Sequence, residues 1–119
     1  MVFMMQGIHH LAIIVSSEEC VKFYEKFGFK EFKRIERNSD IVLLLQGYGI
    51  QLEMFVDASH PLRSMPEPLG LRHIALKVDD IEKVIADLGL INSPIMNDWV
   101  GARCCFIKDP DGNTIELHE

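Results

Sequence analysis

The chain has 119 residues, of which 48% are hydrophobic and 25% charged, and it carries a net charge of −6 at neutral pH. This length and composition predict one soluble globular domain with a substantial core rather than a disordered chain. The negative charge argues against a nucleic-acid partner, and no apolar run approaches the roughly 20 residues of a membrane span.

The first half of the chain predicts a strand, a helix and three further strands. Residues 7–15 are apolar and β-branched, which is typical of a strand. Ser16 and Glu19 have capping-box spacing, and an apolar stripe then recurs at helical spacing until Gly28, so a helix is expected between Ser16 and Gly28. Strands are predicted at 29–36, 41–45 and 50–56, with turns at 38–40 and 47–49.

The second half repeats this order after a segment without periodicity. Residues 57–70 carry three prolines, so they are predicted to link a module at 1–56 to a module at 71–119. A strand at 71–78 is followed by a helix that Asp79 or Asp80 caps and Gly89 ends. A short strand interrupted by Pro94 is expected at 91–96, and strands are expected at 103–107 and 114–118, on either side of the turn at 109–113.

A shift of 63 positions aligns the two halves of the sequence. It places His73 on His10 and Glu116 on Glu53, so that a histidine and a glutamate 43 residues apart occur twice. Three smaller residues align with the same shift: Ala12 with Ala75, Val15 with Val78, and Gly49 with Gly112. The repeat predicts two copies of one βαβββ module, each presenting one imidazole and one carboxylate.

Strand alternation predicts where these four side chains point. The apolar alternating residues suit the face that each helix covers, so His10, Glu53, His73 and Glu116 fall on the opposite, concave face. If the two modules join into one open, mixed β-sheet barrel of the α+β class, the four side chains converge. Two imidazoles and two carboxylates suit one divalent ion such as Ni, Zn, Co, Mn or Fe, with positions left for water or substrate. Each residue alone is more often an ordinary core or surface residue, and the doubled spacing is what favours a site.

Four motifs resemble the vicinal oxygen chelate superfamily, which includes glyoxalase I, methylmalonyl-CoA epimerase, extradiol dioxygenases and bleomycin-resistance proteins. They are His10-Leu-Ala-Ile-Ile-Val, Gln51-Leu-Glu53, Arg72-His73-Ile-Ala-Leu-Lys-Val-Asp-Asp and Asp109-Pro-Asp-Gly-Asn-Thr-Ile-Glu116-Leu. The resemblance implies paired βαβββ modules around one metal, usually in a homodimer. It also implies that the metal ligands are His10, Glu53, His73 and Glu116.

Within that superfamily the ligand set is most similar to that of bacterial glyoxalase I. The resemblance implies a lyase that isomerises the hemithioacetal of methylglyoxal and glutathione through a metal-stabilised enediolate, with a ligand glutamate moving the proton. We favour Glu116 as this base, because its turn and strand are well defined and Thr114 could orient it; Glu53 is the other candidate. Glyoxalase I typically has an arginine that helps to hold glutathione at the position of Ile14, which argues against glutathione here.

Three alternatives use the same fold. An epimerase of an acyl thioester would use the same proton chemistry, but such relatives more often carry glutamine at the position of Glu53. An extradiol-type dioxygenase binds Fe(II) with two histidines and one glutamate, and Glu53 would crowd that ion. A non-enzymatic, antibiotic-binding protein normally lacks the ligand set. The sequence leaves open whether the metal site forms within one chain or between two.

Other residues are assigned less specific roles. His9 is expected on the side of its strand away from His10, in packing or an interface, and His60 and His118 are not assigned to the metal. Arg103 and Lys77 could meet an anionic substrate, although an exposed charge is the commoner role. The N-terminus lacks the basic region and apolar core of a signal peptide, and the odd number of cysteines predicts reduced thiols in a cytoplasmic protein.

Overall fold

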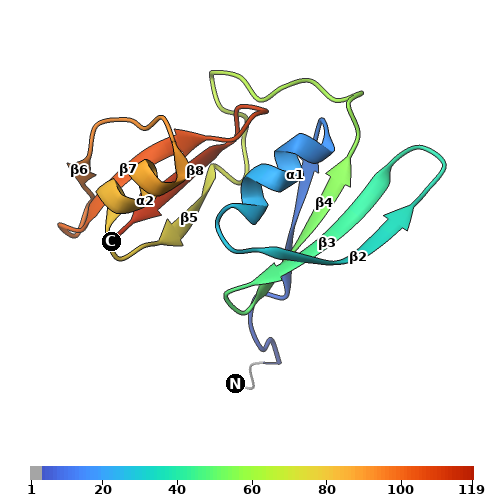
Figure 1. Ribbon diagram of the computed structural model, residues 1–119, viewed down its shortest axis with the longest axis horizontal. Helices are drawn as coiled ribbons and strands as arrows, with labels where there is room; N and C mark the ends of the chain where they lie inside the picture. The colour runs from blue at the N-terminus through green and yellow to red at the C-terminus, as the bar shows by residue number, and fades with distance from the viewer. Residues whose placement is uncertain (1–3) are drawn as a thin grey trace. The chain divides into compact units, whose positions relative to one another are not determined.

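The computed structural model describes residues 4–119 and consists of two compact units, which divide between Pro61 and Leu62 (Figure 1). Each unit contains one helix and four strands in the order strand, helix, strand, strand, strand. The predicted α+β fold with a repeated βαβββ order is therefore confirmed. Among the described residues, strand pairing forms two separate four-stranded sheets and does not close into one barrel. No helix in residues 4–119 is long and apolar enough to cross a membrane.

The first unit forms a mixed sheet with the strand order β1-β4-β3-β2. Strand β1 runs parallel to β4, whereas β3 is antiparallel to both β4 and β2. The elements are β1 (His10–Val15), α1 (Glu18–Glu25), β2 (Lys30–Glu36), β3 (Ile41–Gly47) and β4 (Ile50–Val56). The parallel pair requires a crossover connection, and α1 is part of that crossover.

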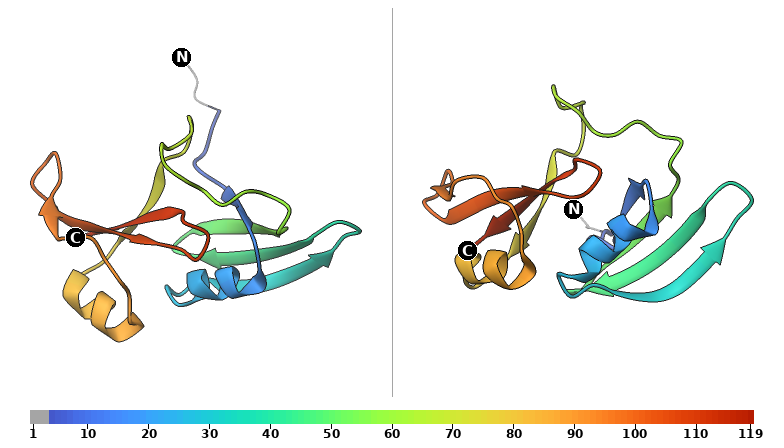
Figure 2. Two further views of the ribbon diagram at one scale, coloured as in Figure 1. Left: turned by 90° about the horizontal axis from the view of Figure 1, so that it is seen from above. Right: turned by 45° about the horizontal axis from the view of Figure 1, so that its top comes forward.

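One face of this sheet forms the core of the unit. Leu52 and Met54 on β4 pair with Leu45 and Leu43 on β3, and all four side chains are at most 1% exposed. Helix α1 lies against the same sheet and contributes three buried residues: Cys20, Val21 and Tyr24 (Figure 2). The other face of β1 and β4 is only partly covered within the unit, and it is the face that carries His10 and Glu53.

The start of α1 differs from the sequence prediction. The residue that caps the helix is Ser17 rather than Ser16, and the Ser17 side chain makes no capping hydrogen bond. Two adjacent serines precede two glutamates, and the sequence spacing alone does not determine which serine leaves the helical conformation.

At the other end of the unit, Tyr48 and Gly49 form the β3–β4 turn with φ angles of 56° and 77°. Two consecutive left-handed residues are typical of a tight hairpin turn.

The second unit repeats the architecture with the strand order β5-β8-β7-β6. Strand β5 runs parallel to β8, and the other neighbours are antiparallel. The elements are β5 (His73–Lys77), α2 (Ile81–Leu88), β6 (Met96–Asn97), β7 (Arg103–Lys108) and β8 (Thr114–His118). The core of this unit contains six side chains that are at most 2% exposed: Ile81 of α2, and Cys104, Cys105, Ile107, Ile115 and Leu117 of the sheet.

The ends of α2 agree with the sequence prediction, but the segment after it does not. Asp80 caps the helix, because its side chain accepts a hydrogen bond from the backbone N–H of Lys83 at 3.1 Å, and Gly89 ends it with φ 63°. The strand expected at 91–96 is wrong, since only Met96–Asn97 pairs with β7. Pro94 lacks a backbone N–H and cannot complete a strand ladder, which confines the pairing to the residues after it.

A hydrogen-bonded turn determines where β8 begins. Asp109 is 4% exposed, and its Oδ1 accepts hydrogen bonds from the backbone N–H groups of Asp111 and Asn113, both at 2.9 Å. Its Oδ2 accepts a third from the side-chain amide of Asn113, also at 2.9 Å. The turn therefore delivers Thr114 to the start of the strand that carries Glu116.

Candidate functional site

In the first unit, His10 and Glu53 lie on neighbouring parallel strands and contact each other. Glu53 lies directly opposite Ala12, and His10 lies opposite Gln51, so the pair is diagonal across the β1–β4 ladder. The His10 Nε2 atom is 3.0 Å from the Glu53 Oε2 atom. The small side chain of Ala12 leaves room for the two longer side chains to meet.

The second unit reproduces this geometry with His73 and Glu116. Glu116 lies opposite Ala75, and His73 lies opposite Thr114. The His73 Nε2 atom is 3.4 Å from the Glu116 Oε1 atom. Each histidine identified from the sequence is thus next to its glutamate, on the same register diagonal in both units.

Both pairs remain accessible within their own units. The side chains of His10 and Glu53 are 39% and 28% exposed, and those of His73 and Glu116 are 24% and 14% exposed. Side chains that are partly exposed in this way can accept a ligand without local unfolding. The convergence of all four residues on one ion stays a prediction.

The two histidines differ in what contacts their second ring nitrogen. The Nδ1 atoms of His9 and His10 are 2.9 Å apart, and the two rings meet edge to face. Strand alternation predicted His9 on the side away from His10, and this is wrong. Strand β1 begins only at His10, so the alternation does not extend to His9. By contrast, Nδ1 of His73 is buried and has no hydrogen-bond partner among the described residues, while the His73 ring packs edge-on against Phe106.

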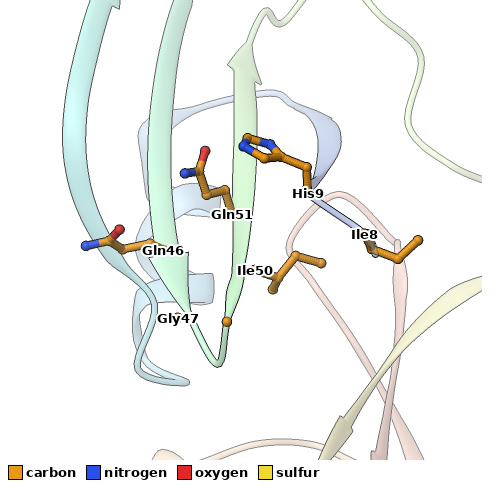
Figure 3. Close-up of a pocket in the computed structure, with 7 residues that line it drawn as sticks. Ile8, His9, Gln46, Gly47, Ile50 and Gln51 are labelled. Atoms are coloured by element: carbon orange, nitrogen blue, oxygen red, sulfur yellow. The ribbon is translucent and has the colours of Figure 1, made fainter. Parts of the chain in front are cut away.

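A shallow pocket lies beside His10 at the turn end of the first sheet (Figure 3). It has a volume of about 440 Å³. Seven residues line it: Ile8, His9, Gln46, Gly47, Gly49, Ile50 and Gln51. Because Gln51 is the strand neighbour of His10, the pocket adjoins the His10–Glu53 pair. Its polar groups are two primary amides and an imidazole, without a lysine or arginine.

Sequence reasoning missed His118 as part of this site. The His118 Nδ1 atom is 2.9 Å from the Glu116 Oε2 atom, so the carboxylate of Glu116 contacts one imidazole through each oxygen. Thr114 was predicted to orient Glu116. The Thr114 hydroxyl instead accepts a hydrogen bond from Lys108 Nζ at 2.7 Å. The available signal was strand alternation, which puts Thr114, Glu116 and His118 on one face.

A cluster of carboxylates at the start of α2 does not form a second site. Asp80, Glu82 and Glu119 have oxygens within 4.8 Å of one another. However, the guanidinium of Arg103 bonds both Glu82 and Glu119, and its hydrogen bond to Glu82 holds the pKa of that carboxyl below its usual range. The cluster is therefore an ion-pair network around Arg103.

Repeated βαβββ units, each with a His–Glu diagonal, are the architecture that the motifs in the sequence implied. Residues 7–117 match the Glyoxalase/Bleomycin resistance protein/Dioxygenase superfamily. The chain belongs to this superfamily, which confirms the resemblance identified from its motifs.

Similar proteins span the whole chain. The uncharacterized protein YwkD of Bacillus subtilis is 39% identical, with 98% of each chain covered, and the uncharacterized protein YaeR of Escherichia coli is 36% identical, with 97% of each covered. A solved glyoxalase family protein from Enterococcus faecalis is 37% identical, with a TM-score of 0.88 over 98% of this chain and 100% of that one. Structures below 25% identity share the fold alone. They include a lactoylglutathione lyase from Agrobacterium tumefaciens, the antibiotic-binding protein TnmS3 from Streptomyces, and a fosfomycin resistance protein from Listeria monocytogenes in complex with Mn(II).

Proposed function

We propose that this protein is a metal-dependent enzyme, similar to glyoxalase I, that moves a proton on a small molecule with two neighbouring oxygens. The observation that carries the proposal is the His–Glu diagonal, which occurs in the same register in both units. In this proposal His10, Glu53, His73 and Glu116 bind one divalent ion. A duplicated pair of imidazole and carboxylate groups is a donor set that first-row divalent metals prefer.

The donor distances support a metal site. With metal–ligand bonds of about 2.1 Å, adjacent ligand atoms lie about 3.0 Å apart in an octahedron and about 3.4 Å apart in a tetrahedron. The two His–Glu pairs have separations of 3.0 and 3.4 Å, so either pair could span an edge of such a polyhedron with little movement. The second distance also exceeds the usual range of an N–H···O hydrogen bond.

The ring nitrogens of the two histidines differ in how well they suit a metal ligand. Nε2 of His73 faces Glu116, whereas its Nδ1 is buried without a hydrogen-bond partner among the described residues, which costs about 1–3 kcal/mol. In the His10 pair, the contact with His9 occupies Nδ1 and leaves Nε2 to point toward Glu53. An imidazole held through one nitrogen and free at the other is the usual arrangement of a metal-binding histidine.

When bound, the ion would supply positive charge to stabilise negative charge on the oxygens of the substrate. The two glutamates then have different roles, one as the base and the other as a fixed ligand. Glu116 contacts an imidazole through both of its oxygens and is 14% exposed, whereas Glu53 is 28% exposed and contacts His10 through one oxygen. A proton acceptor needs a free lone pair and room to move, so these contacts favour Glu53 as the base and Glu116 as a fixed ligand. This reverses the preference that the sequence alone suggested.

The pocket beside His10 supports an uncharged or weakly polar substrate. Its primary amides at Gln46 and Gln51 can donate and accept hydrogen bonds, and Ile8 and Ile50 offer apolar surface. Neither lysine nor arginine lines it, so it provides no fixed positive charge for the carboxylates of a glutathione-type tail. Together with Ile14, this argues for a substrate other than a glutathione adduct.

Metal content and a ligand variant test the proposal. Protein purified without a chelator should contain one divalent ion for each set of four ligands, and His73→Ala should lose it while far-UV circular dichroism stays unchanged. The matched control is His60→Ala, which removes a histidine that pairs with Asp57 outside the site. Full metal occupancy in His73→Ala would remove His73 from the site. A protein that binds an antibiotic equally well in EDTA would instead be a non-enzymatic binder.

A further inference from the structure

The C-terminal residue of β8, His118, holds the Glu116 carboxylate from the side opposite His73. Its Nδ1 atom is 2.9 Å from Glu116 Oε2, while Glu116 Oε1 faces His73 Nε2. Because an ionised carboxylate can only accept hydrogen bonds, Nδ1 of His118 must carry the hydrogen in this contact. The two glutamate oxygens therefore have different surroundings: Oε2 accepts a hydrogen bond from His118, and Oε1 faces His73.

A second, fixed carboxylate lies near the same nitrogen of His118. Asp98 Oδ2 is 3.6 Å from His118 Nδ1. The Asp98 side chain is itself held in a turn, because Oδ1 accepts backbone hydrogen bonds from Ala102 at 2.8 Å and from Val100 at 3.0 Å. The bond from Ala102 is the main reason that the pKa of Asp98 lies below its usual value. Nδ1 of His118 therefore has two carboxylates near it, of which Glu116 is the nearer and Asp98 is held in place by the β6–β7 turn.

The first unit has a different residue at the position equivalent to His118. The shift of 63 positions that aligns the two glutamates places Phe55 at the position of His118. The Phe55 ring packs under the guanidinium of Arg37, whose carbon lies 5.6 Å from the ring centre. Phenylalanine offers no donor to Glu53, so the duplication has retained the glutamate in both units but has given only Glu116 an imidazole partner on its own strand.

We propose that His118 is a positioning residue that fixes Glu116 through Oε2 and leaves Oε1 as its metal-binding atom. The inference rests on the metal site proposed above. A carboxylate fixed in this way binds through a single oxygen and loses less freedom on binding. Partners of this kind, which contact a ligand rather than the metal, commonly change metal affinity about 10–100-fold when removed.

Two substitutions at one position separate positioning from a general structural role. His118→Ala removes the donor, whereas His118→Asn retains an N–H group near the position of Nδ1. We expect Co(II) affinity, measured on the full-length chain by competition with a chelator, to fall about 10–100-fold in His118→Ala and to recover most of the loss in His118→Asn. The visible absorption bands of bound Co(II) should shift in His118→Ala and return in His118→Asn. His60→Ala is the control and should match the wild type in both measurements.

The outcomes distinguish this inference from the proposal on which it rests. Wild-type protein that does not bind Co(II) would overturn both. Wild-type binding with unchanged affinity and spectrum in His118→Ala would overturn only the role of His118. Equal losses in both variants, in proportion to a lower thermal unfolding temperature, would show that His118 serves the fold and would also overturn positioning.

Discussion

Two glycines related by the internal repeat offer a controlled test of the turn that precedes β8. Gly112 has φ 87°, and a Cβ added there would lie 2.9 Å from the carbonyl oxygen of Arg63. Gly49 has φ 77° and occupies the same place in the first unit, but a Cβ there would meet nothing within 4 Å. The carbonyl of Arg63 cannot move freely, because the Arg63 backbone N–H donates to Asp111 O at 3.3 Å and its guanidinium donates to Leu71 O at 2.7 Å.

The structure therefore predicts different costs for the same substitution. Alanine in the left-handed region costs about 1–2 kcal/mol, and both glycines carry this term. Gly112→Ala must in addition displace the backbone carbonyl of Arg63, a residue held by two hydrogen bonds, which we estimate at about 1–3 kcal/mol from the cost of overpacking. We expect the free energy of unfolding to fall by about 1–2 kcal/mol in Gly49→Ala and by about 2–5 kcal/mol in Gly112→Ala.

Urea unfolding combined with amide hydrogen exchange measures both costs. Exchange in β4 reports on the unit that contains Gly49, and exchange in β8 reports on the unit that contains Gly112. Equal destabilisation by the two substitutions would refute the reasoning, because it would mean that the Arg63 carbonyl does not limit the space at Gly112.

Three further predictions concern chemistry, assembly and the thiols. At saturating metal, Glu53→Gln should lower turnover about 10²–10⁴-fold, whereas Glu116→Gln should mainly weaken metal binding and recover turnover when metal is added; the reverse pattern would make Glu116 the base. Sedimentation at micromolar concentration should show a homodimer, as the open sheet edges favour, and a protein that is only monomeric would contradict this. Cys20, Cys104 and Cys105 are buried, and desolvation raises the pKa of the Cys104 and Cys105 thiols, so less thiolate is present at any given pH. A thiol reagent at pH 8 should therefore label none of the three in the folded protein and all three in urea, and labelling of the folded protein would be inconsistent with this burial.

The regular parts of the fold were predictable from local sequence patterns. The strands at 50–56 and 114–118 have the bounds that alternation predicted, and Asp80 and Gly89 delimit α2 as expected. These segments combine a clear hydrophobic period with residues that end or begin an element, so local and tertiary preferences agree. The segment from 90 to 99 has neither a period nor a terminating signal apart from Pro94, and there the prediction of a strand at 91–96 was wrong.

The sequence predicted which residues of the candidate site share a sheet face, but not which of their side chains contact each other. Strand alternation and the repeat identify which residues share a face, and therefore bring His73 together with Glu116. Alternation does not determine which of two neighbours on that face, Thr114 or His118, reaches the carboxylate. Lys108 on the adjacent strand bonds the Thr114 hydroxyl, and only the pairing of β7 with β8 reveals that competitor.

The supporting contacts differ between the units although the two His–Glu pairs have the same register. In the first unit the imidazole of His9 contacts His10, and Glu53 is more exposed than Glu116 of the second unit. In the second unit the imidazole of His118 contacts the glutamate, and His73 has a buried nitrogen without a partner in the described chain. The strand register alone brings each histidine next to its glutamate, in both units. The residues that surround each pair can therefore differ between the units. That divergence gives a physical basis for the unequal roles that we propose, in which Glu116 is the fixed ligand and Glu53 is the carboxylate that takes the proton.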